Sequence, residues 1–171
     1  MFGPRSGVSF YHTPNPDKPT PLDGPEVVPA CLNDLPEVIA VARELGKENS
    51  AYQVNEDIAI PMIRSVLAGD GLVGIVRADN GSIAGTILLK VAYYWGSSQP
   101  FLDEYWVYVR GEYRKSNIAR SLIQFAKHQA DKLGLLLRIG IISKIELARK
   151  MQLYERLLGA PKVCHHTYVP N

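Results

Sequence analysis

The chain has 171 residues, 46% of them hydrophobic, which suffices for one sizeable core and is typical of a single α/β domain. Its formal net charge of +2 argues against a nucleic-acid partner, because binding a polyanion requires a clustered basic face. Two cysteines without a Cys-x-x-Cys spacing predict reduced thiols. Without a signal pattern or an apolar run of the roughly 20 residues that span a membrane, we expect a soluble, cytoplasmic protein.

The N-terminal stretch differs in composition from the rest. Residues 1–30 contain seven of the twelve prolines and show little periodicity. We predict an extended arm over residues 1–30 and one domain over residues 31–171. Such an arm cannot form a core of its own. It packs either on its own domain or on a partner chain, and the second case would give a homo-oligomer or a larger assembly.

Two helices are predicted after the arm. The first begins with Asp34 as its cap and Pro36 in its first turn, and it ends at Gly46. The second runs over about 57–68, with Pro61 near its first turn because proline breaks a helix interior.

A change of period then predicts strands. Branched and aromatic residues fill Leu72–Arg77, Ile83–Trp95 and Phe101–Val109. Asn80-Gly81 between the first two runs is a strong hairpin signal. We therefore expect an antiparallel three-strand meander.

The remaining elements alternate. A helix is predicted over Ile118–Leu133, and the continuous apolar run Leu135–Ile142 predicts a buried strand parallel to the one before that helix. A helix over Ile145–Leu158 and a last strand over Lys162–Val169 complete the chain.

The stretch 103–119 joins a strand, a short basic loop and the start of a helix. The first N–H groups of a helix have no partner within the helix, and Arg114 and Lys115 flank them here, which suits a phosphate group. The alternative interpretation is a solvated basic turn before an ordinary helix.

This order of elements resembles the GCN5-related N-acetyltransferase (GNAT) superfamily. The family's acetyl-CoA signature, Arg/Gln-x-x-Gly-x-Gly/Ala after a strand ending in valine, is similar to Arg114-Lys-Ser-Asn-Ile-Ala119 following Val107-Tyr-Val109. Its later Tyr-Glu-x-Leu-Gly motif is similar to Tyr154-Glu-Arg-Leu-Leu-Gly159. The resemblance covers roughly residues 28–169. It implies an α/β (α+β) fold with a mixed, mostly antiparallel central sheet flanked by helices. It also implies a V-shaped splay between the strands before and after the Ile118 helix.

The resemblance further implies direct transfer of an acetyl group from acetyl-CoA to a primary amine of a small molecule or a protein. The acceptor would lie between the loop 47–54 and the strand 101–105. Asn117 stands where the family usually has glycine, and we expect the turn to persist because asparagine tolerates left-handed backbone angles well. The implied coenzyme-binding residues are Val107, Tyr108, Val109, Arg114, Lys115, Ser116, Asn117, Ile118 and Ala119.

Two side chains are candidates for proton transfer. Glu104 is the candidate base, because a carboxylate in a partly apolar cleft has a raised pKa; the alternative is a charge at the sheet edge that faces solvent. Tyr154 is the candidate acid, since the family places a tyrosine hydroxyl near the coenzyme sulfur; the alternative is a core tyrosine. Cys164-His165-His166 does not predict a metal site, because consecutive strand residues point to opposite faces.

A rival function follows from the departures from the family pattern. Asn117, the imperfect motif around Tyr154 and the proline-rich arm are also compatible with weak or lost catalysis. The protein would then be a binding or structural component of a larger assembly, such as a virion.

Overall fold

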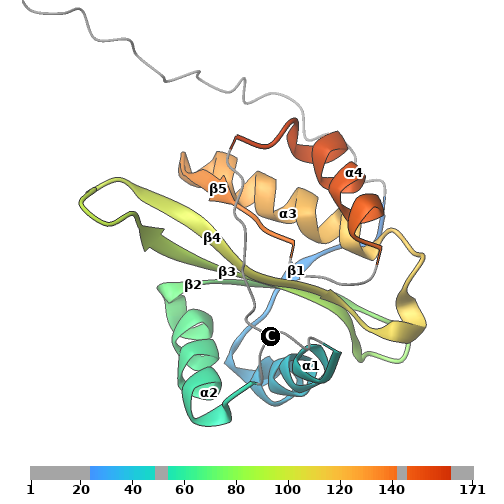
Figure 1. Cartoon of the computed structure of the whole chain (residues 1–171). Coiled ribbons are helices and arrows are strands. Elements are labelled where there is room, and N and C mark those ends of the chain that lie inside the picture. Colours follow the sequence, from blue (N-terminus) through green and yellow to red (C-terminus); the bar gives the residue numbers. More distant parts are fainter. Residues whose placement is uncertain (1–23, 49–53, 142–145, 163–171) are drawn as a thin grey trace, which may run out of the picture.

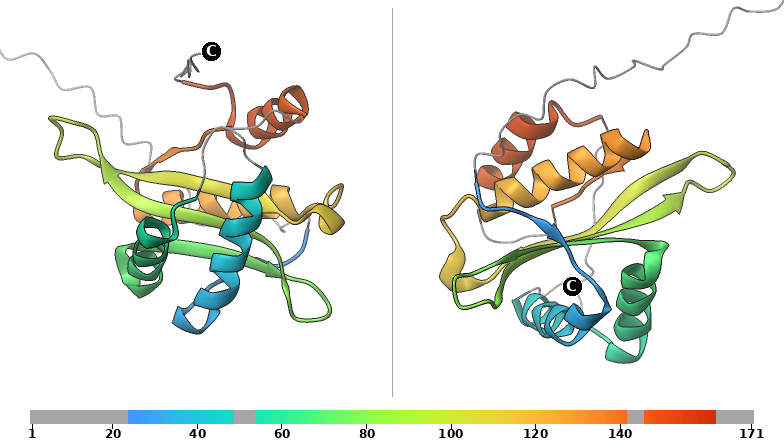
Figure 2. Two further views of the ribbon diagram at one scale, coloured as in Figure 1. Left: turned by 60° about the horizontal axis from the view of Figure 1, so that its bottom comes forward. Right: turned by 180° about the vertical axis from the view of Figure 1, so that it is seen from behind.

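The computed structural model describes residues 24–48, 54–141 and 146–162. Its centre is a five-stranded sheet in the order β1-β2-β3-β4-β5, with α1 and α2 on one face and α3 and α4 on the other (Figures 1 and 2). The strands are β1 (Val28–Pro29), β2 (Gly71–Arg77), β3 (Ile83–Tyr93), β4 (Pro100–Val109) and β5 (Leu136–Arg138). The helices are α1 (Leu35–Glu48), α2 (Glu56–Ser65), α3 (Ile118–Leu133) and α4 (Leu147–Leu158), with single turns at η1 (Leu32–Asp34), η2 (Val66–Asp70) and η3 (Gly111–Tyr113).

The predicted meander is confirmed. β2 pairs with β3 and β3 pairs with β4, both antiparallel, while β5 lies parallel to β4. The turn between β2 and β3 contains Gly81 at φ 84°, a backbone angle that glycine adopts without strain. A mixed, mostly antiparallel sheet flanked by helices therefore forms as expected.

The sheet separates two hydrophobic clusters. Side chains of α1 and α2 pack on one face around Val38, Val41 and Ile63. Side chains of α3 pack on the other face around Leu122 and Ala126. Because both faces of β3 are covered there, its residues Ile83–Leu89 are all buried.

The ends of the first two helices differ from the prediction. Asp34 lies inside the turn η1 and accepts a hydrogen bond from the Cys31 N–H at 2.8 Å, so it closes that turn instead of capping α1. α1 continues through Gly46, where a Cβ would lie 2.5 Å from Val54 Cγ2. This glycine allows a close approach and does not end the helix.

Pro61 was expected in a first turn but lies inside α2. The helix begins at Glu56, close to the expected start at about 57, because Asn55 caps it and accepts a hydrogen bond from the Asp57 N–H at 3.0 Å, so Pro61 falls beyond the first turn. Proline in a helix interior removes one backbone hydrogen bond, and here Pro61 lies on the exposed side of α2.

The expectation of a long buried strand over Leu135–Ile142 is wrong. β5 has only three residues, and Leu136 is 70% exposed. β5 is the last strand in the sheet order, so it is paired on one side only within the described residues. The last predicted strand, Lys162–Val169, lies outside the described residues except for Lys162.

The sequence did not predict β1. Val28 pairs with Ile75, the Ala30 N–H donates to the Val73 carbonyl at 2.8 Å, and Val27 belongs to the core. Residues 24–30 therefore pack on the domain, and the extended arm over the preceding residues stays a prediction. Among the described residues, no helix is long and apolar enough to cross a membrane.

Candidate active site

The strands β4 and β5 separate after a short paired segment. Their register ends with Asp103 opposite Arg138, and the Arg138 Nε donates to Asp103 Oδ1 at 2.7 Å. β4 continues to Val109 without β5 beside it. A cavity of about 720 Å³ opens here, lined by β4, the loop after it, α3 and α4.

A glycine lets α3 approach the sheet at this opening. A Cβ on Gly85 would lie 2.6 Å from Ile118 Cγ2, so only glycine fits beneath the first turn of α3. The Ser121 N–H makes the first intrahelical bond, to the Asn117 carbonyl at 3.0 Å. The N–H groups of Ala119 and Arg120 precede that ladder and are available to an anion.

The loop before α3 has a defined shape. The Ser116 hydroxyl donates to the Tyr113 carbonyl at 2.7 Å and accepts from the Ile118 N–H at 3.3 Å. The left-handed backbone angle expected at Asn117 is instead found at Lys115, with φ 70°. Asn117 has φ −84° and ψ 5°, because it is already the cap residue of α3.

Arg114 contacts its neighbours in the protein. Its Nη2 donates to Glu48 Oε2 at the end of α1, and its Nε donates to the Val109 carbonyl at 3.2 Å. The guanidinium carbon also lies 5.7 Å from the centre of the Tyr108 ring. Through these contacts Arg114 connects the loop after β4 to the end of α1.

Glu104 is the most perturbed carboxylic acid among the described residues. Desolvation by burial raises its pKa to about 7, and the negative charge of Asp103 acts in the same direction. The Gly140 N–H donates to Glu104 Oε2 at 3.0 Å and partly opposes this rise. The carboxyl group is therefore poised to gain or lose a proton near neutral pH.

Tyr154 of α4 lines the same cavity as Glu104. Burial, and then the charge of Glu104, raise the pKa of its phenol above the ordinary value of 10.0. The hydroxyl consequently keeps its proton throughout the physiological pH range.

The structure brings nearly all the predicted site residues to one cavity. Ile118 is the exception, because its side chain is only 6% exposed and packs in the core. Sequence reasoning missed further cationic residues that α3 and α4 bring to the cavity: Arg120, Arg149, Lys150 and Arg156. Arg149 and Lys150 lie about one turn before Tyr154 on α4, a spacing that could have signalled them.

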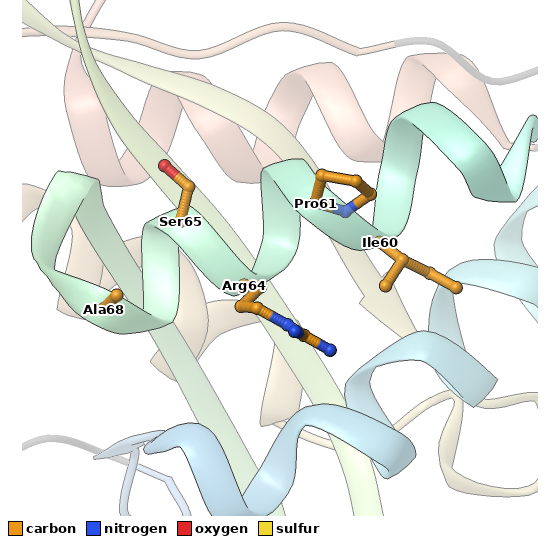
Figure 3. Close-up of a pocket in the computed structure, with 5 residues that line it drawn as sticks. All are labelled: Ile60, Pro61, Arg64, Ser65 and Ala68. Atoms are coloured by element: carbon orange, nitrogen blue, oxygen red, sulfur yellow. The ribbon is translucent and has the colours of Figure 1, made fainter.

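A second hollow lies along the outer side of α2 and η2 (Figure 3). Its lining residues are Ile60, Pro61, Arg64, Ser65 and Ala68, which come from consecutive turns of one segment. Convergent groups from several elements are typical of a ligand site, so we assign this hollow no role. Across residues 24–48, 54–141 and 146–162, no three His, Cys, Asp or Glu side chains gather as metal ligands, and Cys164-His165-His166 lies outside these ranges.

Comparison with known proteins gives one family. Residues 38–160 match the model of the acetyltransferase (GNAT) family. The chain belongs to this family. The search of curated proteins found no match to this chain.

Solved structures show the same fold. A possible acetyltransferase from Clostridium difficile 630 has a TM-score of 0.64 and 20% identity, covering 85% of this chain and 96% of its own. AAC(6')-Iy in complex with a CoA bisubstrate analogue has a TM-score of 0.65 and 15% identity, with coverages of 85% and 97%. A ribosomal-protein-alanine N-acetyltransferase from Brucella melitensis biovar Abortus 2308 has a TM-score of 0.60 and 15% identity, with coverages of 85% and 99%.

Proposed function

We propose that this GNAT protein transfers an acetyl group from acetyl-CoA directly to a primary amine of a small molecule or a protein. The observation that carries the proposal is Glu104, a carboxyl group with a pKa raised to about 7 in a cavity that also contains Tyr154. A base with a pKa near the working pH is the most effective at removing a proton from an ammonium group.

The donor would lie along β4 and over the first turn of α3. The backbone of Val107, Tyr108 and Val109 is the proposed contact for the thioester and pantetheine. The N–H groups of Lys115, Ser116, Asn117 and Ala119 are the proposed contacts for the pyrophosphate, since the Ile118 N–H already donates to the Ser116 hydroxyl. The cationic side chains that line the cavity, from the loop, α3 and α4, suit the charge of such a ligand.

Glu104 acts as the base in the proposed reaction, directly or through one water. The deprotonated amine nitrogen attacks the thioester carbonyl carbon, so a C–N bond forms and the C–S bond breaks. Tyr154 gives its proton to the leaving thiolate. The amine nitrogen loses two protons in all: one reaches solvent through Glu104, and the other balances the proton that Tyr154 supplies.

A coupled assay tests this proposal. Purified protein is incubated with acetyl-CoA and a panel of amines, and free thiol is measured with a chromogenic disulfide. Because structurally similar proteins include an aminoglycoside acetyltransferase and a ribosomal-protein-alanine acetyltransferase, the panel contains aminoglycosides, a peptide with N-terminal alanine, and spermidine. We expect amine-dependent thiol release that is lost in Glu104→Gln and kept in Glu155→Gln, an exposed residue of α4 that does not line the cavity.

Thermal unfolding with acetyl-CoA separates this proposal from its rival. A ligand that binds only the native state raises the melting temperature. No rise at millimolar acetyl-CoA would refute the donor assignment. A rise without turnover of any amine would favour the rival interpretation, a domain that binds coenzyme but has lost catalysis.

A further inference from the structure

The cavity continues around the edge of β4 to the α1 side of the sheet. A bulge in β4 between Glu104 and Trp106 changes which side chains face which helix layer. Trp106 and Tyr108 pack with the α1 and α2 cluster, whereas Val107 packs against the α3 cluster. Since all of these residues line one cavity, it has a donor end near α3 and a second end near α1.

The α1 end contains a carboxylate and a buried indole. Glu48, the last residue of α1, accepts a hydrogen bond from the Tyr108 hydroxyl at 2.8 Å and another from Arg114. Trp106 is only 8% exposed, and its buried indole N–H has no hydrogen-bond partner in the described part of the chain. Because this N–H is enclosed by protein atoms, Glu48 is the group at this end that a ligand can reach.

Glu48 is ionised at neutral pH. Desolvation acts to raise its pKa, but the hydrogen bonds from Arg114 and Tyr108 outweigh that effect and lower the pKa below its ordinary value. A carboxylate beside a phenol suits an ammonium group.

Arg114 connects this end to the donor end. It directly precedes the loop proposed to hold the pyrophosphate, yet its Nη2 contacts Glu48. Both side chains of this ion pair are about 40% exposed, and ion pairs that solvent reaches are weak. A pyrophosphate offers a guanidinium more charge and bidentate geometry, so it can displace Glu48 as the partner of Arg114.

We propose that Glu48 binds the ammonium group of the acceptor. In the absence of coenzyme Arg114 is paired with Glu48, and the coenzyme pyrophosphate replaces Glu48 as the partner of its guanidinium. This inference rests on the proposed function, because the exchange requires a pyrophosphate at the start of α3. Donor binding then creates the cation site at the α1 end, with the Tyr108 hydroxyl beside it.

Calorimetry with desulfo-CoA, an unreactive donor analogue, tests the exchange. Glu48→Gln removes the competitor for Arg114 and should tighten desulfo-CoA binding by about two- to fivefold, the range expected of an exposed ion pair. The same substitution in an Arg114→Gln background should change nothing. Glu44→Gln is the matched control, because Glu44 lies one turn earlier on α1 and pairs with Arg110 instead.

Spermidine tests the second half of the proposal. It should bind wild-type protein more tightly when desulfo-CoA is present, and this gain should vanish in Glu48→Gln but persist in Glu44→Gln. If wild-type protein does not bind desulfo-CoA, the proposed function itself fails. If it binds, but Glu48→Gln has the same effect with and without Arg114, the exchange is refuted. If the exchange holds and spermidine shows no gain, the assignment of Glu48 to the acceptor is overturned.

Discussion

Replacing Glu104 by glutamine should stabilise the protein at alkaline pH while abolishing its activity. Burial raises the pKa of Glu104 from 4.5 to about 7, so the native state favours the protonated carboxyl and is penalised when it ionises. The gap between these values corresponds to about 3 kcal/mol, at about 1.36 kcal/mol per pH unit. Because Glu104 is partly exposed, solvent reduces this penalty somewhat. We therefore expect the substitution to raise the free energy of unfolding by about 2 to 3 kcal/mol.

The sign of the effect fixes its pH window. Below about pH 4.5 Glu104 is protonated in both the folded and the unfolded protein, so its stabilising contribution is fully present and the substitution gains nothing. As pH rises towards 7 that contribution is lost, and above pH 7 the variant shows its full advantage. Glutamine can still accept the Gly140 N–H, so no hydrogen bond is forfeited.

Urea unfolding at a series of pH values from 4 to 8.5 measures the difference. At pH 8 the melting temperature should also rise, by about 5–10 °C for a chain of this length. Glu155→Gln controls for the removal of one negative charge, because this residue is exposed. A gain that is independent of pH, or a loss of stability at pH 8, would refute the conclusion that Glu104 is desolvated in the folded protein.

Three further substitutions test separate parts of the site. Tyr154→Phe should lower kcat about 100-fold in steady-state assays with little change in desulfo-CoA affinity, because only the proton donor is lost; an unchanged kcat would exclude it as the acid. Gly85→Val should cost about 1–3 kcal/mol in urea unfolding and weaken desulfo-CoA binding, since the new side chain displaces Ile118 and the start of α3; unchanged affinity would show that α3 does not position the donor. Lys115→Gly should be more stable than Asn117→Gly by about 1 kcal/mol, because only the first position has a left-handed backbone; equal stabilities would contradict this assignment.

The meander could be predicted because its signals are local. Alternating and branched residues specify the strands, and Asn80-Gly81 specifies the turn between two of them. β1 could not be predicted in this way. Val28 and Pro29 form a strand only because β2 offers an open edge to pair with. A segment of two residues, one of them a proline, shows no periodicity that could indicate a strand.

The error at β5 has a different cause. A continuous apolar run predicts burial on both faces, but it does not tell whether a neighbouring strand covers it. Leu136 pairs with Phe101 of β4 on one side, but no described strand lies on the other side of β5, and Leu136 is 70% exposed. Pro61 was expected near the first turn of a helix starting at about 57, but the cap at Asn55 starts α2 at Glu56, which leaves Pro61 beyond that turn.

The candidate site likewise contains residues that the sequence indicates and residues that only the fold brings together. Motifs contiguous in sequence indicated Tyr154 and the loop after β4, and the strand before that loop indicated Glu104. The fold brings all of them to one cavity. Glu48 was missed because it gains significance only from its spatial neighbours Tyr108 and Arg114. Nothing near Glu48 in the sequence indicates that Arg114 contacts it.

The loop before α3 explains how asparagine replaces the usual glycine of the family. A glycine is required only where φ is positive, and the positive angle here belongs to Lys115. A lysine in that region carries a strain of about 1 kcal/mol. The hydrogen bonds of Ser116 to residues on both sides can hold it in place.

Asn117 has a further neighbour in the N-terminal segment. A Cβ on Gly24 would lie 3.2 Å from the Asn117 Cβ and 2.4 Å from the Ser121 Oγ, so the chain leading into β1 passes directly over the first turn of α3. A glycine at position 117 would remove a packing contact with this segment and relieve no backbone strain. Asn117 therefore fits both the local backbone and the neighbouring N-terminal segment, and it does not by itself argue against a pyrophosphate at the start of α3.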